Sequence, residues 1–200
     1  MSLNIRAALI AAVVIALSGC AAKGSWMGAD AEKAYDKELE IKRMSEVLNN
    51  DDYYEIHKDG RILVLADAKG YQIWLQTGEI PLGVTKIGGG KKGETLRFEL
   101  TKREAKIMES KVGFKGGAQS LYEGVTEGLP KGFFGFVRDK AGFHVFDNWN
   151  ELKAYRQTGK MPTGGDVVKK GQDGATVFYA NKSDELKQRF AKLHDLSSLK

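Results

Sequence analysis

The chain has 200 residues, of which 42% are hydrophobic and 28% charged, and this composition excludes disorder as the main state. Its single Cys excludes a disulfide framework and a zinc site built from cysteines. The formal net charge of +5 is small, so it permits an anionic partner without requiring one and gives no reason to expect a nucleic acid.

The N-terminus has the pattern of a targeting segment. One charged residue, Arg6, precedes an uncharged, mostly apolar run from Ala7 to Leu17. A helix of that length rises about 16 Å, too little to cross a bilayer core of about 30 Å. Its terminal position and the flanking Arg6 predict a signal peptide, with a buried core helix as the alternative.

This segment ends in Leu17-Ser18-Gly19-Cys20, an aliphatic residue and two small residues before a Cys. The four residues resemble the lipobox of bacterial lipoproteins, and the resemblance covers residues 1–20 only. It implies a diacylglycerol on the Cys20 sulfur, cleavage after Gly19, and acylation of the new N-terminus by a fatty acid such as palmitate. The implied partner is therefore a membrane, reached through the lipid on Cys20.

The residue after the lipobox bears on the destination. In Gram-negative lipoproteins an Asp there commonly retains the protein at the inner membrane, whereas this chain has Ala21. The resemblance therefore implies the cell outer membrane, with the body facing either the periplasm or the medium. In a Gram-positive source it implies the outer face of the plasma membrane.

Two segments precede the body. Residues 20–28, which follow the signal peptide of residues 1–19, are small and weakly patterned and are expected to form a tether. Residues 29–50 show apolar positions at helical spacing and predict an amphipathic helix. That helix either packs one stripe on the body or binds a partner.

The body contains an internal repeat. QTGEIP at residues 76–81 recurs as QTGKMP at residues 157–162, and with that offset nine of 29 positions are identical across 76–104. We interpret this as two copies of one unit, over 51–110 and 132–200, with the similarity ending near residue 195. The Gly-rich stretch 111–131 is expected to be a mobile connection or a packed irregular hairpin.

Each unit reads as β-β-α-β-β-α. Asp59-Gly60 predicts a hairpin, Asp67 and Asn148 are preferred helix N-caps, and Gly78 and Gly159 end the helices they precede. The predicted elements are strands at 53–57, 61–66, 83–88, 94–100, 166–170 and 175–180, and helices at 68–77, 102–110, 149–158 and 183–194. The fold class is therefore α+β, with two tandem units after a lipoprotein signal and an N-terminal helix.

Several apparent motifs carry no chemistry. The stretch 88–95 (GGGKKGET) is similar to a phosphate loop, but Glu94 stands where such a loop needs Lys, so a hairpin turn is expected. His57, His144 and His194 show no metal-ligand spacing. No catalytic residue, metal site or cofactor is predicted.

A basic segment is the candidate binding surface. Residues 82–106 carry seven bases and three acids, and Lys86, Lys91, Lys92 and Arg97 are the candidates for binding an anionic ligand. The alternative is a solvated hairpin whose lysines prevent strand-to-strand aggregation. The aromatic stretch from Phe133 to Trp149 is expected to pack in the core, although strand alternation would bury some of its side chains and expose others. The alternative is an exposed groove for a partner.

Together these features favour a lipid-anchored lipoprotein that acts as a non-catalytic binding or assembly component of the cell envelope. Its expected partner is an envelope protein or an anionic polysaccharide. The alternative is an envelope enzyme that acts on peptidoglycan or polysaccharide with carboxylates from both units, so the sequence leaves the question of catalysis open.

Overall fold

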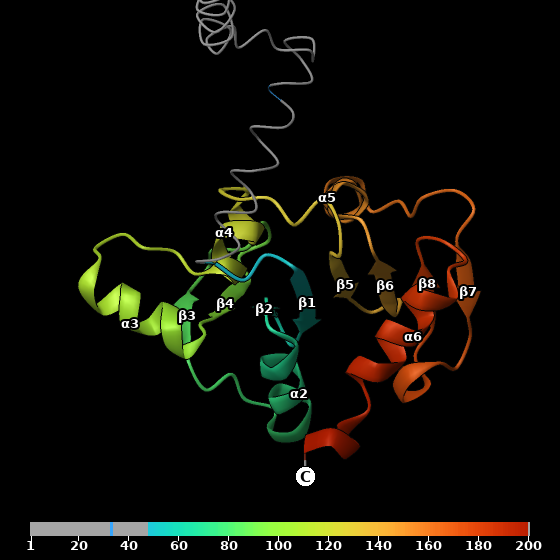
Figure 1. Ribbon diagram of the computed structural model, residues 1–200, viewed down its shortest axis with the longest axis horizontal. Helices are drawn as coiled ribbons and strands as arrows, with labels where there is room; N and C mark the ends of the chain where they lie inside the picture. Colours follow the sequence, from blue (N-terminus) through green and yellow to red (C-terminus); the bar gives the residue numbers. More distant parts are fainter. Residues whose placement is uncertain (1–32, 34–47, 200) are drawn as a thin grey trace, which may run out of the picture. The chain divides into compact units, whose positions relative to one another are not determined.

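The computed structural model describes Lys33 and residues 48–199, and the elements named here lie in the second range (Figure 1). The first half of the sheet comprises β1 (Asp52–Lys58), β2 (Arg61–Leu65), β3 (Gly83–Lys86) and β4 (Thr95–Glu99), with helices α2 (Ala68–Thr77) and α3 (Lys102–Ser110). After α4 (Gly117–Glu123), the second half comprises β5 (Phe134–Arg138), β6 (Phe143–Phe146), β7 (Asp166–Val168) and β8 (Val177–Tyr179), with α5 (Trp149–Thr158) and α6 (Asp184–Leu193). Short 3-10 turns occupy Gln172–Gly174 and Leu196–Leu199.

All eight strands form one mixed sheet, in the order β3-β4-β2-β1-β5-β6-β8-β7. The α+β class is therefore confirmed. Hairpin pairs β1/β2 and β5/β6 are antiparallel, whereas β1 and β5 pair parallel at the centre, with Ile56 beside Arg138. Because of this parallel pairing, the two hairpin turns lie at the same end of the sheet.

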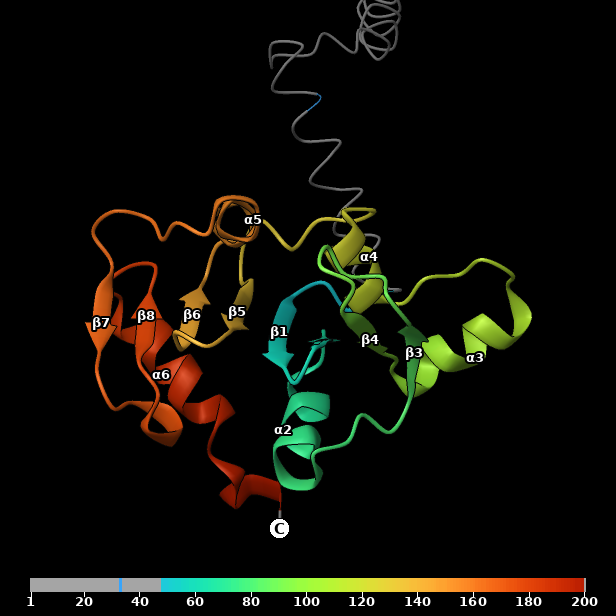
Figure 2. The same cartoon turned by 180° about the vertical axis from the view of Figure 1, so that it is seen from behind.

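Helices cover both faces of the sheet. One cluster of buried residues packs α4 and α5 on one face, through Leu121 and Leu152. The other cluster packs α2 and α6 on the opposite face, through Tyr71 and Phe190 (Figures 1 and 2). The helix after the first hairpin and the helix after the second therefore lie on opposite sides of the sheet.

Covering both faces corrects one expectation. The stretch from Phe133 to Trp149 was expected to bury some aromatic side chains and expose others, yet all of its Phe and Trp residues are buried. Alternate side chains of β5 and β6 point to opposite faces, and each face has a helix to receive them.

Local signals set the boundaries of the elements. Asp59 and Gly60 have φ values of 51° and 71°, so they form the tight two-residue turn that the Asp-Gly pair predicts. Asp67 and Asn148 accept hydrogen bonds from the first backbone N–H groups of α2 and α5. Both helices end at a left-handed glycine, so helices 68–77 and 149–158 are confirmed.

Residues 111–131 differ from the expectation, because they contain α4 rather than only an irregular connection. Gly117 begins this helix at a point where a Cβ atom would lie 2.2 Å from the carbonyl oxygen of Asn49. Glycine is required there by a long-range contact, and helix propensity gives no sign of it. Leu121 of α4 is fully buried against β2 and β4.

Candidate functional site

The end of the sheet where the hairpin turns meet is hollowed into an open cavity of about 660 Å³, named here the hairpin cavity. Residues 57–61, 92, 94 and 139–141 line it. Three turns meet here because β1 runs parallel to β5 and β2 runs parallel to β4. The loop before β4 is fixed to the first turn by a hydrogen bond from the Thr95 N–H to the Gly60 carbonyl oxygen, 3.2 Å long.

Basic side chains dominate the rim of the hairpin cavity. Lys58, Arg61, Lys92 and Lys140 line it, and within residues 48–199 none of the four forms an ion pair. Long cationic side chains without a carboxylate partner are available to a ligand that brings negative charge.

The rim also carries three acids, Asp59, Glu94 and Asp139, and the last two are engaged by the turns that carry them. Glu94 accepts the Lys92 N–H at 2.8 Å, and backbone N–H groups lower its pKa. Asp139 accepts the N–H groups of Ala141 and Gly142 at 2.8 and 3.3 Å. Burial raises the pKa of Asp139, but these N–H groups and nearby His144 outweigh it and leave the pKa below its usual value.

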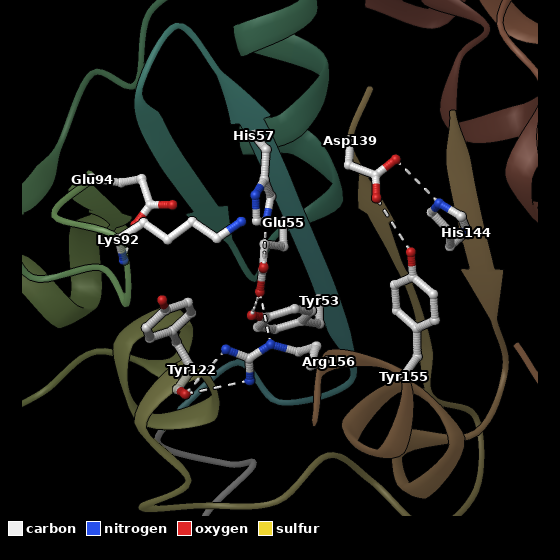
Figure 3. Close-up of polar contacts among 10 residues, drawn as sticks. All are labelled: Tyr53, Glu55, His57, Lys92, Glu94, Tyr122, Asp139, His144, Tyr155 and Arg156. Carbon is white, nitrogen blue, oxygen red and sulfur yellow. Dashed lines mark hydrogen bonds and ion pairs between the residues drawn. The ribbon is translucent and has the colours of Figure 1, made fainter. Parts of the chain in front are cut away.

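Beneath the cavity, β1 presents three polar side chains in a row on one face, Tyr53, Glu55 and His57 (Figure 3). The Glu55 carboxylate accepts hydrogen bonds from the Tyr53 hydroxyl, from His57 Nε2 at 2.6 Å and from Arg156 Nε at 2.8 Å. Arg156 comes from α5 and also donates to the Tyr122 carbonyl oxygen of α4. This network joins the centre of the sheet to both helices of that face.

The network sets the charges of its members. Burial raises the pKa of Glu55, but the hydrogen bond from His57 and the charge of Arg156 outweigh burial, so the pKa is lowered. The hydrogen bond to Glu55 raises the pKa of His57 against the opposing effect of burial. The pair therefore favours an ionised carboxylate and an imidazolium.

A second histidine on the same face has the opposite character. His144 of β6 lies 3.2 Å from Asp139 and stacks between Tyr155 and Phe178, with ring centroids 4.5 and 4.8 Å away. Burial lowers the pKa of His144 and outweighs the charge of Asp139. His144 thus favours the neutral form and packs between aromatic rings, whereas the hydrogen bond to Glu55 makes His57 favour the charged form.

A smaller cavity of about 330 Å³ lies beside Trp74 and Arg97 and shares Lys58, Asp59 and Arg61 with the hairpin cavity. Arg97 of β4 is held in place there, since it donates to Thr85 Oγ1 at 2.8 Å and to the Ile80 carbonyl oxygen at 2.9 Å. The end of the β1–β2 hairpin therefore carries basic residues on both sides.

The candidate anion-binding residues do not form one patch. Lys92 lines the hairpin cavity and Arg97 the smaller one. Lys86 is bonded to Glu123 and lies on the face of the sheet opposite Arg97, because the β3–β4 register pairs it with Leu96. Lys91 is exposed and lines neither cavity. The lipidation candidate Cys20, the tether and nearly all of the predicted helix 29–50 lie outside the described residues.

Residues that the sequence did not indicate complete the site, namely Glu55, His57, Lys58, Arg61, Lys140 and Arg156. The only local signal near them is the Asp59-Gly60 turn, which predicts a hairpin and no ligand. Their assembly depends on contacts between strands and helices far apart in the sequence, such as Glu55 with Arg156.

The described part of the chain offers neither a metal-binding cluster nor a membrane-spanning helix. No group of three or more His, Cys, Asp or Glu residues within it is placed to hold a metal ion. Within the same residues, no helix has the length and apolar character needed to span a membrane. The loop 88–95 is a hairpin turn between β3 and β4, as expected, and no helix follows it to face a phosphate.

Comparison with protein-family models, with curated proteins and with solved structures gave no match for this chain. The function must therefore be inferred from the residues and geometry of the hairpin cavity.

Proposed function

We propose that this protein is a lipid-anchored lipoprotein of the cell envelope and acts as a non-catalytic binding or assembly component. Its hairpin cavity is proposed to bind the anionic groups of an envelope polymer such as an acidic polysaccharide. The observation that carries the proposal is the pattern of charges in the cavity. Four bases line it without an ion pair to any described residue, whereas two of its three acids, Glu94 and Asp139, are occupied by backbone N–H groups.

The cellular part of the proposal rests on the N-terminal sequence. The resemblance of residues 17–20 to a lipobox supports lipid attachment at Cys20 and, with Ala21 after it, the outer membrane. An anchored protein needs little affinity for a polymer in the same compartment, because anchoring raises the effective concentration of each partner.

A tandem duplication is part of the proposal. Residues 51–110 and 132–195 are proposed to be two β-β-α-β-β-α units descended from one, and the order of strands within each half of the sheet supports this. Hydrogen bonds at equivalent positions add support: Thr77 and Thr158 each donate a side-chain hydrogen bond of 2.8 Å to a carbonyl four residues earlier. Such a scaffold brings turns of both units to one cavity.

Binding is favoured over the alternative of an envelope enzyme by the state of the carboxylates. A glycosidase needs one carboxylic acid that keeps its proton at the working pH. Glu55 and Asp139 come from the two units and lie at or beneath the cavity, but both have lowered pKa values and are ionised. Neither is suited to be the acid.

The binding proposal is tested with a Lys92→Ser/Lys140→Ser variant, which removes two rim charges. Both side chains are exposed, so the fold should persist while binding to an acidic polysaccharide weakens and becomes less sensitive to salt. A Lys106→Ser/Lys169→Ser variant is the matched control, since it removes the same charge from exposed positions outside the cavity. Binding is measured by co-sedimentation at several ionic strengths. If both variants lose the same amount of binding, the loss follows from net charge and not from the cavity.

The anchor is tested separately with Cys20→Ala. The variant should remain as precursor or move to the soluble fraction, because the thiolate that receives the lipid is missing. Metabolic labelling with a fatty acid measures this directly. If mutant and wild type are labelled equally, the lipobox assignment is wrong.

A further inference from the structure

His57 occupies the point where the buried network of β1 reaches the hairpin cavity. Its side chain is 38% exposed, whereas that of Glu55 beneath it is 7% exposed. The ring lines the cavity together with the basic residues of the rim. His57 is therefore placed to contact a bound ligand on one side and the Glu55 carboxylate on the other.

We infer that His57, positioned by Glu55, binds the anionic group of the ligand in the hairpin cavity and makes its affinity rise as the pH falls. This inference rests on the proposed function and adds to it a binding residue, a positioning residue and a pH dependence.

The hydrogen bond to Glu55 determines which ring nitrogen is left for a ligand. An ionised carboxylate only accepts hydrogen bonds, so Nε2 of His57 must carry the proton that it shares with Glu55 Oε1 across 2.6 Å. Nδ1 is then the remaining nitrogen. In the imidazolium it carries an N–H that can be donated to an oxyanion, whereas in the neutral ring it presents a lone pair that an oxyanion avoids.

Glu55 is itself held rigidly. Arg156 binds its other oxygen at 2.8 Å, and the guanidinium lies 5.3 Å from the ring centroid of Tyr53 and 4.5 Å from that of Tyr122. A carboxylate fixed from three sides cannot turn away from His57 and keeps the ring in one orientation. Glu55 therefore acts through His57 and does not itself meet the ligand.

The other charged groups around His57 act in both directions. Asp139, from the β5–β6 turn, and Glu94, from the β3–β4 loop, add to the effect of Glu55 and raise the His57 pKa further. Asp59 is a further acid of the cavity. The cations around His57 are Arg156, beneath Glu55, and the four bases of the rim, Lys58, Arg61, Lys92 and Lys140. The net result is a pKa above the ordinary value of 6.5, so the cavity loses a positive charge as the pH rises through that higher value.

Other groups with raised pKa values provide a control. Burial raises the pKa of Asp52 to about 6 and that of Glu99 to about 8, but they line two other cavities next to α2. Burial lowers the pKa values of His144 and His194. Of the three histidines, we therefore expect only His57 to have a pKa above 6.5.

The first measurement follows the histidine ring signals of residues 20–200 by NMR from about pH 5.5 to about pH 8.5, a range that spans the ordinary histidine pKa. The signal lost in His57→Gln is assigned to His57. It should titrate above 6.5 in the wild type and at a lower pH in Glu55→Gln. A His57 pKa at or below 6.5 would overturn the inference.

The second measurement is the affinity for dextran sulfate over the same range, chosen because sulfate esters stay ionised throughout. Affinity of the wild type should fall by about two- to fivefold as His57 loses its proton, the change expected for one partly exposed charge. In His57→Gln the affinity at low pH should drop to the high-pH value of the wild type. Glu99→Gln should keep the wild-type profile.

The outcomes separate the two proposals. Binding that is independent of pH, or whose pH dependence persists in His57→Gln, overturns the role of His57 and leaves anion binding intact. Absence of binding at every pH overturns the proposed function and the inference together. Because His57 is partly exposed, its variant tests the inference even if Glu55→Gln fails to fold.

Discussion

The loop between the third and fourth strands of each half is closed by the same two backbone hydrogen bonds but carries different charges. Its hydrogen bonds are Gly90 N–H to Glu94 O and Gly93 N–H to Gly90 O in the first half, and Gly171 N–H to Ala175 O and Gly174 N–H to Gly171 O in the second. The first loop carries Lys91 and Lys92 where the second carries Gln172 and Asp173. The closing hydrogen bonds thus come from glycine N–H groups in both loops, whereas the charges differ.

A second difference lies where the helix of each half meets its sheet. In the first half, Glu99 of β4 lies against Gly70 of α2, and burial raises the Glu99 pKa to about 8. The positions 81 residues later are Ala180 and Glu151, so the second half carries its carboxyl group on the helix instead. The two halves therefore differ in which element carries the acid.

The comparison teaches that backbone form and site chemistry have separate origins in this protein. Helix caps and the hydrogen bonds that close the loop before the last strand repeat between the halves. The row of Tyr53, Glu55 and His57, by contrast, belongs to the first half and meets Arg156 of the second. In β5 the position equivalent to Glu55 is Phe136, a fully buried core residue. The predictions below test this separation.

The largest effect is expected from Trp74→Ala and Tyr155→Ala. Trp74 is 8% and Tyr155 7% exposed, on α2 and α5 respectively, and they lie 81 residues apart, the offset of the proposed repeat. Each truncation should lower the free energy of unfolding by about 3–5 kcal/mol, because it leaves a cavity under a helix. Urea denaturation followed by circular dichroism measures both. If either variant loses less than about 1 kcal/mol in its free energy of unfolding, positions 74 and 155 are not equivalent.

A smaller loss is expected from Gly70→Ala. The new Cβ atom would lie 1.5 Å from Glu99 Oε1, so overpacking should cost about 1–3 kcal/mol. Adding Glu99→Ala removes the clash and recreates the small strand residue of the second half. The double variant should therefore be more stable than Gly70→Ala alone, with a coupling energy above about 1 kcal/mol. If the losses in the free energy of unfolding of the two single variants simply add in the double variant, the side chains at positions 70 and 99 do not compete for the same space.

The pH dependence of stability should change in Glu99→Gln. The Glu99 pKa is raised from 4.5 to about 8, so the folded state holds a proton that the unfolded state releases between these values. In the wild type this group therefore makes stability fall as the pH rises from about 4.5 to 8. The variant lacks that penalty and should gain more than about 1 kcal/mol relative to wild type at pH 8 compared with pH 5. A constant difference would place the Glu99 pKa near its ordinary value.

Much of the local structure followed from the sequence. The helices at 68–77, 102–110 and 149–158 and the Asp59-Gly60 turn have the predicted bounds, because caps and turns act over a few residues. Strand ends were predicted less accurately: β1 extends one residue beyond the predicted 53–57 at each end, whereas β3 ends at Lys86 rather than at residue 88. Strand ends depend on the partner strand, which local sequence does not name.

The candidate site was predicted only in part, for a physical reason. Lys92 and Arg97 were identified from a local excess of bases, and both line cavities. Glu55 and Arg156 are 101 positions apart and meet only because β1 pairs with β5 and α5 crosses that face. No local pattern encodes such a pairing, so the network and the charged state of His57 required the structure.

The smallest effect on stability is expected when the first loop receives the residues of the second, in Lys91→Gln/Lys92→Asp. Both side chains are exposed and the glycines that close the loop are kept, so the free energy of unfolding should change by less than about 1 kcal/mol. Dextran sulfate binding should weaken, because Lys92 leaves the rim and an acid takes its place.

The reciprocal Gln172→Lys/Asp173→Lys variant is the sharper half of the test. It adds the same basic pair to the second loop, which does not line the hairpin cavity, and should not raise the affinity to the same extent. If it does, the paired lysines bind anions wherever the scaffold presents them, and the cavity with His57 adds nothing to the site.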